Sequence, residues 1–329
     1  MMKKRYLPIL TLLPFITAVI CTGIGRYSIG FAESLSVLFA RLTGYEAAKN
    51  AYSVVWNIRM PRIILAAFVG AGLSAAGAAF QGVFSNALAT PDTLGVASGA
   101  SFGAALAMLT GSALFGTQVT ALIFGCSACL LTMVIAGRDR SVSSVILGGM
   151  AVSSVFQALV ALVKYVADPV DELPAITYWL MGSMARASYK SLAVGLPLIV
   201  LGTAVIFLLR WRLDIIALSE DEAASLGMNV GLVRAVFIIA ASLITASCVS
   251  MCGQVGWIGL LVPHISRMIG GSSGKSVIPL SISLGAVFMM IMDTLARTMT
   301  AAEIPISILT ALIGAPMFIA LLRRRRDRT

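Results

Sequence analysis

Stretches of about twenty apolar residues recur along this chain of 329 residues and leave little sequence between them. Hydrophobic residues make up 59% of the sequence and charged residues 12%, which is about half the charged share of an ordinary soluble domain. Runs of this length and composition are typical of helices that cross a lipid bilayer. The sequence therefore predicts an all-α integral membrane protein. Residues 1–329 are expected to form a single transmembrane domain without a separate soluble catalytic domain.

We predict about ten membrane-spanning helices, and an even number places both ends of the chain on one side of the membrane. The eighth is the weakest because it is short and contains Pro263. The first resembles a signal peptide, since basic residues precede it, but no small-x-small cleavage site follows clearly, so an uncleaved span is favoured. The predicted spans are residues 7–25, 60–82, 92–110, 115–136, 142–163, 190–209, 232–250, 254–269, 277–297 and 304–322.

Basic residues orient these spans. They fall in alternate connections, which are the cytoplasmic ones because positively charged loops stay on that side of a membrane. This bias also explains the net charge of +10, so no nucleic-acid partner is expected. The connections at 26–58 and 164–189 then lie outside, and both ends of the chain lie in the cytoplasm. The basic residues are Lys3, Lys4, Arg5, Arg138, Arg140, Arg210, Arg212, Arg267, Lys275 and Arg323 to Arg326.

Small residues recur at intervals of four along two of the spans. They are Ala66, Gly70, Ser74 and Ala78 in the second span, and Gly95, Gly99 and Gly103 in the third. Small side chains at this spacing allow helix backbones to approach closely inside a membrane. We interpret both faces as packing surfaces, and the alternative is that one of them lines a substrate path.

Motifs that could bind a nucleotide or a metal lack the neighbouring residues that such binding needs. The sequence at 274–276 ends like a nucleotide-binding loop, but the required glycine position holds Ile269 and no strand precedes it. Cys126 and Cys129 lie within a span without further metal ligands, and His264 stands alone. We expect no catalytic residues, no metal site and no covalently bound cofactor. If the protein uses ATP, a partner subunit binds it.

A short polar segment at residues 217–230 separates the sixth and seventh spans. Glu220, Asp221 and Glu222 suit the positive end of a helix dipole, and Gly227 can adopt the left-handed conformation that ends a helix. The pattern predicts a short cytoplasmic helix closed by a tight turn. Such a helix is equally compatible with a connector and with a contact surface.

Long blocks of the sequence resemble one transporter family. The sequence EAASLG lies where the permeases of ATP-binding cassette (ABC) importers carry the helix that contacts the ATPase. Four further blocks resemble the FecCD-type permeases for iron–siderophores, haem and vitamin B12: RMPRIILAAFVGAGLSAAGAAFQGVFSNALATPDTLGVASGA, YWLMGSMARASY, GQVGWIGLLVPHISRMIGG and EIPISILTALIGAPMFIALLRRR. The resemblance implies a type II importer permease fold of ten helices in a bacterial cytoplasmic membrane. It also implies a homodimer or a paired paralogue, two ATPase subunits and an extracytoplasmic binding protein.

Three arginines match the basic positions at which the family receives its binding protein. They are Arg59, Arg62 and Arg297, which are expected on the outer face as a solvated rim. A guanidinium group can form paired hydrogen bonds with a carboxylate, and such a rim steers docking more than it adds affinity. The alternative is lipid anchoring or local pairing, and Asp293 lies one turn before Arg297.

The resemblance also assigns the ATPase contact within a coupling segment of about residues 214–230. The residues concerned are Glu220, Glu222, Ala223, Ala224, Leu226 and Gly227.

A cytoplasmic gate is a further hypothesis based on position. Asn86 and Leu88 lie in the turn after the second span, where the family reads Asn-Pro-Leu and this chain has Ala87. With Val142 and Ser143, at the base of the fifth span, this turn is placed to close the inner end of a pathway along the axis of the permease dimer.

The expected cargo is a ferric siderophore, with haem, cobalamin and molybdate left open. Gln157 in the fifth span is a weaker candidate for lining the pathway. An ion-coupled secondary transporter would need buried carboxylates at mid-membrane, and Asp293 is the one plausible candidate. A membrane enzyme is disfavoured because acidic, His, Ser and Cys residues do not converge.

Overall fold

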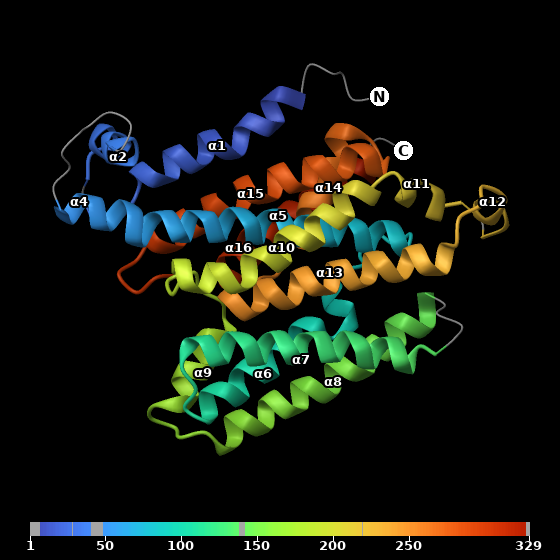
Figure 1. Cartoon of the computed structure of the whole chain (residues 1–329), viewed down its shortest axis with the longest axis horizontal. Helices are drawn as coiled ribbons and strands as arrows, with labels where there is room; N and C mark the ends of the chain where they lie inside the picture. The colour runs from blue at the N-terminus through green and yellow to red at the C-terminus, as the bar shows by residue number, and fades with distance from the viewer. Residues whose placement is uncertain (1–6, 28, 41–48, 138–141, 219, 327–329) are drawn as a thin grey trace.

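The computed structural model describes residues 7–27, 29–40, 49–137, 142–218 and 220–326, and every statement below concerns those residues. Side chains are described within them except at 7–10, 49, 142, 220, 221, 224 and 321–326. The described chain is helical, with no strand among these residues. Most of the helices run along the long axis of the molecule (Figure 1).

The helices follow one another in this order: α1 (Leu7–Gly23), α2 (Phe31–Leu38), α4 (Lys49–Ser53), the π-helical turn η2 (Val54–Arg59), α5 (Met60–Val83), the 3₁₀ turn η3 (Pro91–Leu94), α6 (Val96–Leu109), α7 (Leu114–Ile135), α8 (Val142–Val166), α9 (Glu172–Leu180), α10 (Tyr189–Leu209), α11 (Arg212–Ile216), α12 (Glu220–Ser225), α13 (Val230–Cys252), α14 (Ile258–Gly270), α15 (Gly274–Thr298) and α16 (Ile306–Arg326).

Each of the ten predicted spans coincides with one of these helices. Six described helices are long and apolar enough to cross a membrane: Asn50–Val83, Leu114–Ile135, Ser143–Val166, Tyr189–Leu209, Val230–Cys252 and Gly274–Thr298. Shorter apolar helices supply the other four, at Thr11–Gly23, Val96–Leu109, Ile258–Gly270 and Ile306–Ala320. The largest difference is at the second span, which continues a helix that already begins at Asn50, within the segment predicted as an outside connection. The eighth span also differs, because its helix begins at Ile258 and not at residue 254.

Helices α5, α13 and α15 form the centre of the molecule, and most of their residues are buried by other helices. Helices α7, α8 and α10 expose most of theirs at the periphery. In Figure 1, α6, α7 and α8 gather in a lower group, and α13 separates them from α5, α10 and α15. Contacts of α13 with both α6 and α7 join the two groups.

The two predicted small-residue faces are packing surfaces. A Cβ atom on Gly70 would lie 2.1 Å from the carbonyl oxygen of Gly285, so α5 and α15 touch through their backbones. Gly99 and Gly103 approach α7 in the same way, where Cβ atoms would lie 2.6 and 2.5 Å from the carbonyl oxygens of Phe124 and Thr120. The small-residue interpretation is therefore confirmed for both spans.

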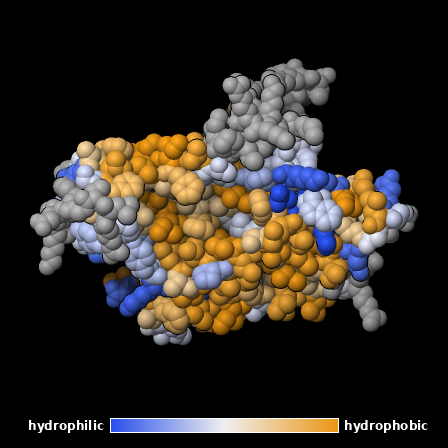
Figure 2. Space-filling model, turned by 45° about the horizontal axis from the view of Figure 1, so that its top comes forward, coloured by the Kyte–Doolittle hydropathy of each residue, from blue (hydrophilic) through white to orange (hydrophobic). Residues whose placement is uncertain are grey.

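The surface has an apolar middle and more hydrophilic ends. In Figure 2 hydrophobic residues cover the central part of this face, and hydrophilic residues gather toward the two ends of the long axis. Helix α1 begins and helix α16 ends on the side of the molecule toward α11 and α12 (Figure 1), as the even number of spans requires. Of the basic residues used to orient the spans, Lys3, Lys4, Arg5, Arg138 and Arg140 lie outside the described residues.

Candidate functional site

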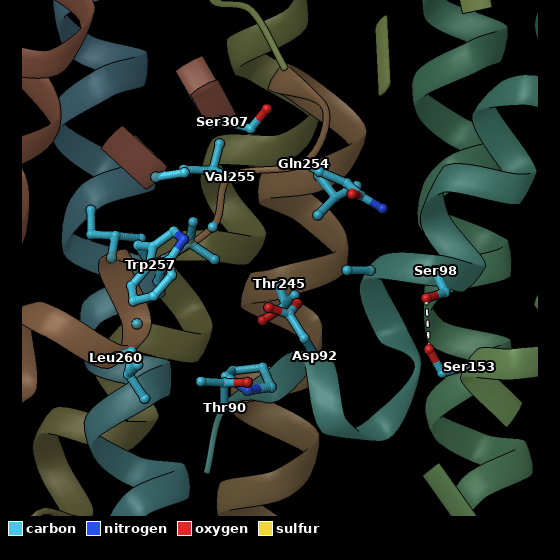
Figure 3. A pocket seen from close by; sticks show the side chains of 18 of the residues that line it. Thr90, Asp92, Ser98, Ser153, Thr245, Gln254, Val255, Trp257, Leu260 and Ser307 are labelled. Carbon is cyan, nitrogen blue, oxygen red and sulfur yellow. Dashed lines mark hydrogen bonds between the residues drawn. The ribbon is translucent and has the colours of Figure 1, made fainter. Parts of the chain in front are cut away.

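A cavity of about 410 Å³ lies among α5, α6, α8, α13, α14 and α16. Ser307, Val255 and Gln254 lie at one end of it, and Thr90, Leu260 and Asp92 lie at the other (Figure 3). The second end is formed by the turn between α5 and α6, which carries the predicted gate residues. The cavity therefore follows the long axis that the spanning helices share.

Hydroxyl and amide groups line this cavity inside an otherwise apolar bundle. Ser98 and Ser153 are joined through their hydroxyl oxygens at 2.9 Å (Figure 3). The Gln157 amide donates to the Ser153 hydroxyl at 3.0 Å. On another wall, the Gln254 amide donates to the Ser101 hydroxyl at 2.9 Å. Such groups satisfy one another here and can exchange hydrogen bonds with a hydrophilic solute.

The cavity lining carries little charge. Asp92 is the one ionisable side chain among the described lining residues, and no basic side chain is among them. Gln157 does line the cavity, as its candidate role required. Asp92 lies in η3, where it is exposed and lines the cavity.

An irregular segment between α13 and α14 supplies one wall of the cavity. Trp257 has φ +66°, which is unusual for a bulky residue and marks a constrained turn. Gly253 has φ +72°, and a Cβ atom there would lie 2.3 Å from the carbonyl oxygen of Trp179. Non-helical backbone at membrane depth is tolerated where protein covers it or a polar cavity solvates it. The repeated glycines of GQVGWIG were the sequence signal for this turn.

Charged side chains cluster at the opposite end from α11 and α12, between α1, α5 and α15. Arg62 donates through Nε to both carboxylate oxygens of Asp293, at 2.7 and 2.9 Å, and through Nη1 to Glu303 at 2.9 Å. Arg297 donates to the carbonyl oxygen of Cys21 at 2.6 Å, and its Nε lies 3.9 Å from Asp293. The cluster joins three helices that are far apart in the sequence.

Arg59 belongs to the same region but forms no ion pair among the described residues. Its guanidinium group donates to the carbonyl oxygens of Thr22 and Tyr27, both at 2.7 Å, and contacts the Ser34 hydroxyl at 3.4 Å. The last carbonyls of a helix lack partners within it and carry partial negative charge. Arg59 and Arg297 therefore both stabilise the C-terminal end of α1.

The expected solvated rim of arginines is wrong for this structure. Arg59 is 2% exposed, and Arg62 and Arg297 are each 6% exposed. The physical reason is that carboxylates and helix carbonyls within the chain already satisfy these cations, which would otherwise be unstable at this depth. The docking role itself stays a prediction.

The coupling segment has the local structure that the sequence predicted. A short helix, α12, ends where Gly227 adopts φ +74°, and the Met228 amide then donates to the carbonyl oxygen of Ala223. Ala223 is buried, whereas Glu222, Leu226 and Gly227 are exposed. The side chains of Glu220 and Ala224 lie outside the described ones. The ATPase contact assigned to this segment stays a prediction.

The turn with the predicted gate residues is ordered by its own hydrogen bonds. The Asn86 side chain accepts from the backbone amide of Leu88 at 2.9 Å, and both residues are exposed. The following turn, η3, packs on α8, because a Cβ atom on Gly149 would lie 2.0 Å from the carbonyl oxygen of Thr93. Ser143 is exposed near the start of α8, and the Val142 side chain lies outside the described ones. Gate function stays a prediction.

Comparison with known proteins identifies the family to which this architecture belongs. Residues 12–324 match the FecCD transport family. The chain belongs to that family. It is therefore a membrane-spanning permease of the kind that serves ABC importers, with the type II importer permease fold that the sequence predicted.

Three similar proteins illustrate the range of the family. The molybdate import system permease protein MolB of Haemophilus influenzae is 40% identical over 94% of this chain and 92% of its own length. A protein named as an iron chelatin transport system permease of Helicobacter pylori is 36% identical over 83% of each chain. A solved structure described as a metal-chelate type ABC transporter in an inward-facing conformation covers 98% of this chain and 100% of its own, with 38% identity and a TM-score of 0.89.

Proposed function

We propose that this protein is the permease of an importer for a hydrophilic, metal-bearing solute, with a ferric chelate as the first candidate cargo. The observation that carries this proposal is the cavity along the shared helix axis, with hydroxyl and amide groups on its walls. A solute that loses its water inside a membrane needs replacement hydrogen bonds. Ser98, Ser153, Gln157 and Gln254 offer them without binding the solute tightly through charge.

Molybdate is the second candidate. It is supported by the identity to a molybdate permease and by a lining that contains hydroxyl and amide donors suited to oxyanions. Haem fits less well, since its large apolar ring gains nothing from these polar walls. Cobalamin carries amide groups and stays a third candidate.

The complete importer that we propose contains two copies of this permease, two ABC ATPase subunits and an extracytoplasmic binding protein. It lies in a bacterial cytoplasmic membrane with both ends of each permease in the cytoplasm. This arrangement is supported by Figure 1, in which α1 begins and α16 ends on the side toward α11 and α12. ATP is bound by the ATPases, and their movement reaches the permease through α12.

Docking through the arginines needs a change in the cluster. A carboxylate of the binding protein could reach Arg62 by replacing Glu303, whose side chain is 23% exposed, while Asp293 keeps its place. In the Arg59→Glu, Arg62→Glu double variant, uptake should fall and lose its dependence on salt, provided that the variant still assembles.

The test is uptake into proteoliposomes that contain the assembled importer and the loaded binding protein. Radiolabelled ferric citrate, a ferric hydroxamate and molybdate are compared, each with ATP, without ATP and with an ion gradient alone. ATP-dependent accumulation of an iron chelate supports the first candidate, and accumulation of molybdate alone supports the second. Accumulation by the permease alone along an ion gradient would overturn the proposal.

A further inference from the structure

A carboxylate connects the predicted coupling segment to the start of a central helix. Asp214 lies in α11, immediately before α12. Its Oδ1 atom accepts a hydrogen bond from the backbone amide of Gly274 at 2.6 Å, and its Oδ2 atom accepts one from the Ser273 hydroxyl at 2.7 Å. These residues begin α15. The first amides of a helix lack partners within it and favour a negative charge, so this contact is a strong one.

The same junction is closely packed. A Cβ atom on Gly274 would lie 2.4 Å from the carbonyl oxygen of Arg210 and 3.1 Å from the Cβ atom of Leu213. The start of α15 therefore rests directly on the backbone between α10 and α11. A cavity of about 240 Å³ lies beside this contact and is lined by Leu213, Asp214 and Gly274. At the contact itself no side chain separates the two backbones, so a shift of α11 is passed directly to the start of α15.

Helix α15 extends from this junction to the charged cluster at the other end of the molecule. Its 25 residues span roughly 37 Å at the usual helical rise. It packs against α5 at the Gly70 and Gly285 contact, and Arg62 of α5 holds its far end through Asp293. The two helices are thus fixed to each other at the middle and at the outer end.

Helix α5, one of these two helices, ends at the turn that closes one end of the cavity. The turn carries Asn86 and Leu88 and continues into Thr90 and Asp92 of the cavity wall. If α15 moves and α5 moves with it, both the charged cluster and the wall of the cavity are displaced.

We propose that Asp214 is a positioning residue that fastens the coupling segment to α15, so that movement of the ATPases is delivered to the α5–α15 pair. This inference rests on the proposed function, since it requires an ATPase that moves α12. In this inference Asp214 contacts neither the cargo nor ATP. Its contribution is to transmit movement.

The experiment compares variants of the assembled importer in nanodiscs. Asp214→Ala removes both acceptors, Ser273→Ala removes one donor, and Asp214→Asn retains an oxygen that can accept from Gly274. Ser272→Ala is the matched control, since this neighbouring serine is not among the described partners of Asp214. Basal ATP hydrolysis, hydrolysis stimulated by the loaded binding protein, and uptake are measured together.

We expect Asp214→Ala to keep basal hydrolysis but to reduce stimulation and uptake by roughly tenfold or more, since one charge-assisted hydrogen bond changes an equilibrium by about tenfold and this variant loses two. Ser273→Ala should lose less of the stimulation than Asp214→Ala does, and Asp214→Asn should keep more of it than Asp214→Ala. Ser272→Ala should resemble the wild type. Basal and stimulated hydrolysis that fall together would show a merely structural role and overturn the inference.

Full stimulation in both Asp214→Ala and Ser273→Ala would overturn it as well. A failure of the proposed function is distinguishable from these results, because the wild-type complex would then show no ATP-dependent uptake at all.

Discussion

Replacing Arg62 with alanine should strongly destabilise the protein, because it removes the cation that holds a buried acid, Asp293, and a partly exposed one, Glu303. Asp293 is 1% exposed and accepts two hydrogen bonds from Arg62. Without Arg62, its nearest remaining cation among the described residues is Arg297, whose Nε lies 3.9 Å away. Breaking a buried pair in this way costs about 3–5 kcal/mol, and we expect a value near the upper end.

Substitutions of the other members of the cluster should lower the free energy of unfolding by less, in an order set by how deeply each side chain is buried. Asp293→Ala leaves Arg62 with Glu303, so we expect about 3 kcal/mol. Glu303→Ala removes a partly exposed partner and should cost about 1 kcal/mol or less. The Arg62→Met, Asp293→Leu double variant should be less destabilised than Arg62→Ala, since apolar groups of similar size often replace a buried ion pair without loss.

The assay is reversible unfolding of the purified permease in mixed micelles with increasing sodium dodecyl sulfate, followed by tryptophan fluorescence. The free energies of unfolding of these four variants, and of the single variants Arg62→Met and Asp293→Leu, are compared with that of the wild type. If Arg62→Ala and Glu303→Ala had equal effects, or if the double variant were destabilised by the sum of its parts, the assignment of a buried, coupled cluster would be refuted.

Three further predictions follow from other contacts. Gly285→Ala should destabilise the protein by about 1–3 kcal/mol in the same assay, because the added Cβ atom would lie 2.2 Å from the Ser74 hydroxyl oxygen; stability equal to the wild type would contradict the close α5–α15 contact. Gly227→Ala should weaken co-purification of the ATPase, since φ +74° disfavours a side chain by about 1 kcal/mol, and Gly231→Ala is its control. Gln254→Leu should reduce ATP-dependent uptake by roughly tenfold with assembly unchanged, because an amide is lost from the cavity wall; normal uptake would argue against a polar pathway there.

The spans and their packing faces could be predicted because they follow from composition and spacing alone. Apolar length located the helices, and the interval of four located Gly70 and Gly99 at helix contacts. The short helix before Gly227 was predictable because its signals are local.

The contact of Arg297 with Asp293 could be predicted because the two residues are one helical turn apart, and local pairing was the stated alternative to docking. The burial of Arg59 and Arg62 could not be predicted, because their partners are distant in the sequence. Arg62 and Asp293 are separated by 231 residues, and backbone carbonyls of α1 carry no sequence signature at all. The cavity was missed for a related reason. Gln254 and Ser307 come together through the irregular turn at Trp257, where helical periodicity gives no guidance.

The separation between Arg62 and its carboxylate has a consequence for biosynthesis. Ribosomes deliver α5 to the insertion machinery long before α15 exists, so Arg62 enters the lipid environment while Asp293 is still unsynthesised. Until then, the nascent segment must keep this guanidinium at the headgroup level or beside the translocon. Membrane integration of α5 should therefore stay reversible until the ninth span emerges, and truncated chains ending before it should be degraded rather than matured.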